Sequence, residues 1–197
     1  MQIRLILLDF DGTLADTRRA NTLAYVATLR EAGYTPSARD IHISRRTAPA
    51  EIANVMGLSP NTEMVCVQRI QLADEQPVGI LSNYILPEVV PDIEKKDHNF
   101  ISLYRFLEDE YNIRIDTSRD FISARTADLA QATTLKIPVG SPLIYVIRIS
   151  FSDGAPILGD IAYINGYMHH FSFNRSGRSP RLHIAEDASN RSSFGGK

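Results

Sequence analysis

The sequence of 197 residues has little cysteine, no long apolar run and no excess of one charge. A single cysteine, Cys66, excludes a disulfide framework and a cysteine-rich zinc site. No apolar run approaches the roughly 18 residues that a membrane span needs, so we expect no contact with a membrane. The 21 basic and 23 acidic residues give a net charge of −2. A chain that coats nucleic acid would carry a strong basic excess instead.

The length suits one main domain with a core that needs no disulfide bonds. An apolar run over residues 3–8 is followed at once by acidic residues, which predicts a buried strand and not a signal peptide. We therefore expect a cytoplasmic protein. Apolar spacing predicts a helix over residues 18–32 that ends at Gly33, and Pro36 prevents its continuation.

Short sequence patterns recur at an offset of 79 residues. Residues 43–48 recur as 122–127, and residues 65–85 align without gaps to 144–164 with seven identities. Each copy is predicted to contain a loop, a short helix and a two-strand hairpin, and the ordered match argues against chance. Neither copy alone can bury its apolar face. We therefore expect an internal duplication whose copies share one antiparallel sheet, with their helices on one side.

The segment between the two copies has its own pattern. Residues 87–93 are interrupted by proline and are predicted to form a loop. Residues 101–111 are predicted to form an amphipathic helix, because Leu103, Phe106 and Leu107 recur at helical spacing. After residue 171 the composition shifts to Ser, Arg, Asn and Gly, which predicts a poorly ordered polar tail.

The first predicted strand runs into the sequence Asp-Phe-Asp-Gly-Thr, which begins at Asp9. This string resembles the first motif of the haloacid dehalogenase superfamily of phosphatases. The resemblance implies that Asp9 is a nucleophile, that Asp11 is a general acid and base, and that both bind Mg²⁺. It covers residues 3–34 only, because Ser82 and Asp160, which imitate later motifs, fall inside the predicted hairpins.

A second resemblance runs in order through residues 40–171. It is carried by Thr47, Ala50, Leu58, Arg69, Pro77, Val78, Tyr84, Ile85, Ser102, Leu103, Tyr104, Ala127, Leu135, Gly140, Pro142, Arg148, Asp153 and Pro156. These residues are similar to the UTRA domain, the ligand-sensing half of HutC-type regulators of the GntR family. The resemblance implies an α+β, chorismate lyase-like fold, with a mainly antiparallel sheet and helices packed against it. It also implies a homodimer, a small anionic or phosphorylated metabolite as ligand, and no cofactor.

The sequence departs from the UTRA pattern in two respects. About 40 residues precede the match, too few for a winged-helix domain, so we expect contact with DNA only through a domain that this chain lacks. Members that sense amino-sugar phosphates carry a second arginine and a glutamate where this chain has Gln71 and Leu81. The resemblance therefore does not imply that specificity.

We expect three segments: a phosphatase-like fragment over 1–35, an effector-binding domain over 36–171 and a polar tail over 172–197. The leading interpretation is a non-catalytic effector-binding domain. The alternative is a Mg²⁺-dependent phosphatase that uses Asp9 and Asp11. A third interpretation is a composite chain, in which an enzyme fragment was joined to a sensor domain and its two aspartates are vestigial.

Candidate ligand-binding residues come from three places in the sequence. Ser44, Arg45, Arg46 and Thr47 form a predicted loop before a helix, where amide groups and two guanidinium groups would bind an anion. The alternative is a solvated arginine pair with Thr47 as a helix cap. Arg69 lies in an apolar predicted strand and therefore needs a partner or a ligand, although its repeat mate Arg148 leaves a structural role open.

Further candidates lie at the ends of predicted elements. Ser102 and Tyr104 open the helix between the copies, where Ser102 is also a candidate N-cap and Tyr104 a candidate core residue. Tyr163 ends the last predicted strand near the same site. His169 and His170 would point apart on a strand, so we interpret them as surface or edge residues and not as metal ligands.

Overall fold

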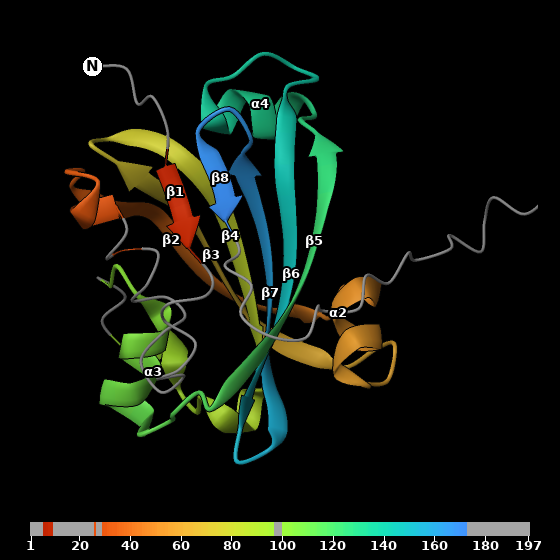
Figure 1. Cartoon of the computed structure of the whole chain (residues 1–197). Coiled ribbons are helices and arrows are strands. Elements are labelled where there is room, and N and C mark those ends of the chain that lie inside the picture. Colours follow the sequence, from red (N-terminus) through yellow and green to blue (C-terminus); the bar gives the residue numbers. More distant parts are fainter. Residues whose placement is uncertain (1–5, 10–25, 27–28, 97–99, 173–197) are drawn as a thin grey trace, which may run out of the picture.

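The computed structural model describes residues 6–9, 26, 29–96 and 100–172 (Figure 1). Its main sheet has six antiparallel strands in the order β2-β3-β4-β7-β6-β5. In chain order they are β2 Pro36–Thr47, β3 Glu63–Ala73, β4 Gln76–Ile85, β5 Thr117–Thr126, β6 Pro142–Ser152 and β7 Ala155–Asn165. The mainly antiparallel sheet with helices packed against it confirms the predicted architecture.

The two halves of the sheet have the same element order. One half is β2, helix α2 (Ala50–Met56), β3 and β4, and the other is β5, helix α4 (Leu129–Leu135), β6 and β7. The halves meet where β4 pairs with β7. This order is the one expected of two copies that share a sheet, and the duplication itself stays a prediction.

Both predicted hairpins are confirmed, and their turns have the conformation that short hairpin loops require. Asp74 and Glu75 have φ of 47° and 66°, and Asp153 and Gly154 have φ of 51° and 76°. Two consecutive positive φ angles give a type I′ turn, whose twist matches that of the flanking strands.

The prediction of loops at 43–47 and 122–126 is wrong, because both segments lie in edge strands. Ser44 pairs with Cys66 in the ladder of β2 and β3, and Ile122 pairs with Val146 in the ladder of β5 and β6. Water contacts the outer edge of an edge strand and parts of both its faces, so its side chains can be polar. That polarity is what made the two segments resemble loops.

Helices cover both faces of the sheet. On β3, Cys66 packs in one apolar cluster with Ile52 of α2, whereas Val67 packs in another with Leu103 of α3 (Leu103–Tyr111). Successive strand residues point to opposite faces, so α2 and α3 lie on opposite sides. Tyr163 packs against the clusters of both α2 and α4, so these two helices share a face. The expectation of one helical side therefore holds for the helices of the two halves but not for α3.

Helix α3 begins where the sequence predicts. The Ser102 hydroxyl accepts a hydrogen bond from the backbone N–H of Arg105 at 3.4 Å, which makes Ser102 the N-cap. Two short 3-10 helices, η2 (Pro87–Val89) and η3 (Ile93–Lys95), fill the segment predicted as a loop. Ile93, Leu103 and Leu107 are fully buried, so this connection is packed onto the sheet.

A small second sheet joins two distant parts of the chain. Strand β1 (Ile6–Asp9) pairs in parallel with β8 (His169–Ser172). Gly33, with φ of 84°, ends the helical residues 29–31, and its N–H donates to the carbonyl of Arg30. His169 lies on β8, an edge strand of this two-stranded sheet, so the edge alternative is confirmed. Its side chain is buried, with 5% of its surface exposed, so the surface alternative is wrong. Asp11, most of the predicted helix over 18–32, and the tail beyond 172 lie outside the described residues.

Among the described residues, no helix has the length and apolar character needed to cross a membrane.

Candidate functional site beneath helix α3

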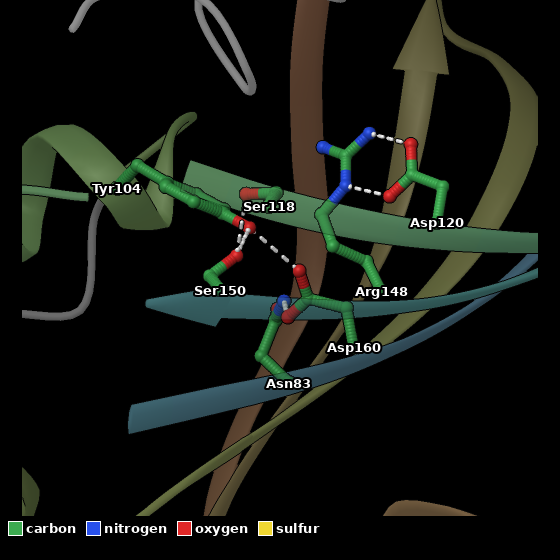
Figure 2. Close-up of polar contacts among 7 residues, drawn as sticks. All are labelled: Asn83, Tyr104, Ser118, Asp120, Arg148, Ser150 and Asp160. Carbon is green, nitrogen blue, oxygen red and sulfur yellow. Dashed lines mark hydrogen bonds and ion pairs between the residues drawn. The ribbon is translucent and has the colours of Figure 1, made fainter. Parts of the chain in front are cut away.

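A row of polar side chains crosses the sheet on the face that α3 covers. In register, Asn83 of β4 is opposite Asp160 of β7, Asp160 is opposite Arg148 of β6, and Arg148 is opposite Asp120 of β5 (Figure 2). Four adjacent strands thus each contribute one polar residue. We call these four residues, together with Arg69, the polar row.

Asp160 lies at the centre of the polar row. One of its carboxylate oxygens accepts a hydrogen bond from the Asn83 amide, and the other accepts one from the Tyr104 hydroxyl at 2.7 Å (Figure 2). The Tyr104 oxygen also lies 2.8 Å from the hydroxyl of Ser150, which lies 3.1 Å from that of Ser118. Because Tyr104 belongs to the first turn of α3, these bonds tie the helix to the middle of the sheet.

Arg148 and Asp120 form a two-point ion pair. The Arg148 Nε lies 2.6 Å from Asp120 Oδ1, and Nη2 lies 2.7 Å from Oδ2. The side chains are only 18% and 17% exposed. Burial opposes the charge of Arg148, but the bonds to Asp120, together with the electrostatic effects of Tyr104, Asp120 and Asp160, raise the arginine pKa. Such charge-assisted paired bonds are among the strongest polar contacts in proteins.

Arg69 is the least satisfied group of the polar row. Its side chain is 2% exposed, and its Nη1 donates to the Asn83 Oδ1. Among the described residues, its Nε has no hydrogen-bond partner. Burial lowers the pKa of Arg69, and the nearby charge of Asp160 opposes that shift. A buried donor without an acceptor costs about 1–3 kcal/mol, so this nitrogen is a natural place for a ligand oxygen.

Asn83 connects Arg69 to Asp160. Its amide oxygen accepts from Arg69 while its amide nitrogen donates to Asp160. Burial raises the pKa of Asp160, although the bonds from Asn83 and Tyr104 and the charges of Arg148 and Arg69 oppose that rise. The site therefore combines a guanidinium, a carboxylate, an amide and a phenol within one connected network. Such groups recognise a small polar molecule by hydrogen bonds and charge.

Among the described residues, no group of three or more His, Cys, Asp or Glu side chains is placed to hold a metal ion. Asp9 is the last residue of β1, and Asp11 lies outside the described residues. The structure therefore does not bring the two aspartates of the phosphatase-like motif into one described site.

The structure gathers only part of the predicted ligand-binding set. Arg69 and Tyr104 meet in one network through Asn83 and Asp160, and Ser102 caps the helix that carries Tyr104.

The other predicted residues lie elsewhere. Ser44 and Arg46 bond to each other on the opposite face, where the Arg46 Nη2 also donates to Gln68 at 3.2 Å. Tyr163 lies on that face too and packs against Tyr145 with ring centroids 4.9 Å apart. Arg45 pairs with Glu94, 2.7 Å away. Thr47 is exposed at the end of β2.

Sequence reasoning missed Asn83, Asp120 and Asp160 as members of the site. The signal that selected Arg69 was a charge inside an apolar strand, and the same signal is present at Asp160 and Arg148. Asp160 was interpreted instead as an imitation of a phosphatase motif, and Arg148 only as a repeat mate. The contact of Asn83 with both charges depends on the pairing register, which the sequence does not display.

The comparisons with known proteins identify the family of this chain. Residues 31–170 match the model of the UTRA domain. The chain belongs to the UTRA domain family. This confirms the second resemblance: the chain is an effector-binding domain of the kind found in GntR-family regulators, and this interpretation holds over the phosphatase alternative.

Curated relatives of this UTRA domain are transcription regulators. The chain is 29% identical over 133 residues to the HTH-type transcriptional regulator Rv0792c of Mycobacterium tuberculosis, which covers 66% of this chain and 48% of that protein. It is 23% identical over 128 residues to the HTH-type transcriptional repressor NagR of Bacillus subtilis, covering 65% of this chain and 52% of that protein. The chain thus spans about half the length of the curated relatives it matches.

Solved structures share the fold. PhnF from Mycobacterium smegmatis superposes with a TM-score of 0.73 at 17% identity, covering 88% of this chain and 73% of that one. The effector domain of PhnF from the same organism gives 0.69 at 19% identity, covering 78% and 94%.

Proposed function

We propose that the polar row beneath α3 is the effector site of a transcription regulator, and that Arg69 binds an acceptor group of a small anionic metabolite. The observation that carries this proposal is the unpartnered Nε of a side chain that is 2% exposed. Buried polar groups are almost always hydrogen-bonded in native proteins, so the exception indicates a site completed by another molecule.

The contact between Tyr104 and Asp160 couples ligand binding to the position of α3. Tyr104 belongs to α3, and its hydroxyl bonds to the carboxylate that shares Asn83 with Arg69. A ligand that engages this network changes the bonds that hold α3 on the sheet. A ligand shifts a conformational equilibrium only by its differential affinity for the two states, and this contact supplies such a difference.

The whole protein is proposed to act on DNA in the cytoplasm. Support comes from the curated relatives, which are named HTH-type transcription regulators and are about twice as long as the match. DNA binding would belong to a winged-helix domain outside this chain, and effector binding would change its affinity for the operator.

The effector site is tested by a thermal-shift screen of phosphorylated sugars and small carboxylates. A ligand at one hundred times its Kd should stabilise the wild-type protein by about 2.7 kcal/mol. Arg69→Met should abolish that response, because it removes the unpaired donor. Arg105→Gln is the matched control: it removes an exposed arginine of α3 that pairs with exposed Asp109, and it should respond like wild type. A full response in Arg69→Met would contradict the proposal.

We propose that the outer edge of β5 pairs with β5 of a second copy to form a homodimer. Within the described residues, β5 pairs only with β6, so the backbone N–H and C=O groups on the outer edge of this ten-residue strand are open to pairing. Adjacent Phe121 and Ile122 are 44% and 41% exposed, one on each face of the strand. Natural sheets rarely leave a long edge with exposed apolar side chains, because it invites pairing.

Repulsion between arginine side chains distinguishes two registers of this dimer. A two-fold axis through an antiparallel pair places one residue opposite itself. With Ile122 opposite itself, Arg119 would be opposite Arg125, which is unfavourable. With Phe121 opposite itself, the two arginines avoid each other.

The dimer is tested by light scattering on Phe121→Lys. This variant should be monomeric at concentrations where the wild type is dimeric. Leu129→Lys is the matched control: Leu129 is also exposed but lies on α4, and its variant should remain dimeric. A dimeric Phe121→Lys variant, or a monomeric wild type, would exclude the β5 edge.

A further inference from the structure

The polar row is electrically balanced before any ligand binds. Its charged members are two guanidinium groups, Arg69 and Arg148, and two carboxylates, Asp120 and Asp160. Arg148 is committed to Asp120 by two short bonds. Arg69 is therefore the guanidinium of the row that retains an unpartnered nitrogen.

Two described residues beside Arg69, Gln71 and Leu81, carry no charge. Gln71 points to the same face of β3, and its amide nitrogen donates to the backbone carbonyl of Ser37 at 2.7 Å. Leu81, opposite Arg69 in the register, is apolar. A ligand that reaches the Arg69 Nε meets one cation and, through the shared Asn83 amide, the nearby carboxylate of Asp160.

The charges of the polar row favour some classes of ligand over others. Charges a few ångströms apart interact more strongly in a buried site than in water, because the effective dielectric constant there is lower. A phosphate dianion on Arg69 would bring two negative charges near Asp160, and a simple carboxylate would bring one. A molecule that also carries an ammonium group would turn that repulsion into an attraction.

Asp160 has the capacity to accept this ammonium group. A carboxylate has about four acceptor positions, and the structure shows two bonds to Asp160, from Asn83 and Tyr104. The Tyr104 hydroxyl is also within reach of Ser150, so it keeps a partner if the ligand takes its place on Asp160.

We propose that the effector is a small zwitterion whose carboxylate bonds to Arg69 and whose ammonium group bonds to Asp160. The inference rests on the proposed effector site and makes Asp160 the residue that selects charge. Arg69 alone would accept any small anion. Asp160 adds a requirement for a cationic donor a few bonds away from the anionic group.

The test is a thermal-shift and calorimetric comparison on the wild-type protein with matched probes. The probes are the standard L-amino acids, the carboxylic acids that lack only the ammonium group, and inorganic phosphate. We expect at least one amino acid to bind ten-fold or more tightly than its counterpart without the ammonium group and than phosphate. A charged hydrogen bond of about 1.5–3 kcal/mol corresponds to a factor of that size.

Asp160→Asn should remove this preference, so that the amino acid and its counterpart bind with similar affinity. Asp109→Asn is the matched control, because Asp109 is an exposed carboxylate on the same helix as Tyr104, and it should keep the preference. The zwitterion is excluded if phosphate or the simple acid binds as tightly as the amino acid to the wild type. If such an anion binds and its binding requires Arg69, the proposed effector site is supported and the zwitterion proposal is wrong. If no probe or metabolite binds, the effector site itself is wrong.

Discussion

Arg148→Met should lower the free energy of unfolding by about 3–5 kcal/mol at pH 7. The substitution removes the partner of Asp120 and the cation that faces Asp160 in the register. Two carboxylates, on the strands that flank β6, would then remain with little access to water and without their shared counter-charge. The measurement is urea denaturation of the wild-type and variant proteins at equal concentration.

The loss should also depend on pH. Burial already raises the pKa of Asp160, so this carboxyl takes up a proton early as the pH falls, and the destabilisation should shrink toward pH 4. Arg45→Met is the matched control. Arg45 is 44% exposed and pairs with Glu94 at the surface, where water screens the ion pair, so its loss should cost far less than the loss of Arg148. A loss at Arg148 no larger than at Arg45 would contradict the role of the polar row.

Protonation of His169 should lower the free energy of unfolding by about 3 kcal/mol when the pH falls from 7 to below 4. Burial lowers the pKa of His169 to about 4, although the hydrogen bond to the Asn165 carbonyl opposes the shift. The folded protein therefore keeps this imidazole neutral, while the unfolded chain binds a proton near pH 6.5. The stabilisation is complete above pH 6.5 and is lost as the pH falls toward 4.

The comparison of His169→Phe with wild type isolates this contribution. Free energies of unfolding measured between pH 7 and 4 should fall less steeply in the variant, which has no group to protonate at this position. Parallel profiles for His169→Phe and wild type would show that the buried ring does not control acid stability.

Local signals in the sequence were enough to predict the hairpins, the short helices and α3. The turns carry Asp at a position that tolerates positive φ, and Ser102 marks the start of α3. The edge strands β2 and β5 were missed because their side chains are largely exposed and lack strict apolar alternation. A polar edge strand is recognised only by the partner strand that it pairs with.

The candidate site could be predicted only in part for a related reason. Arg69 and Tyr104 were found because a charge in an apolar strand and a phenol at a helix start are visible locally. The contact of Asp160 with Tyr104 joins residues 56 positions apart, and its contact with Asn83 depends on the register of β4 with β7. Ser44 and Arg46 were grouped with Arg69, but strand alternation places them on the opposite face.

Backbone and arginine side-chain NMR shifts during titration of a stabilising ligand test the effector site most directly. The account predicts that the largest shifts occur at the Arg69 Nε–H, at Asn83 and Asp160, and at Tyr104 in α3. Shifts centred on Ser44 and Arg46, on the opposite face of the sheet, would contradict it.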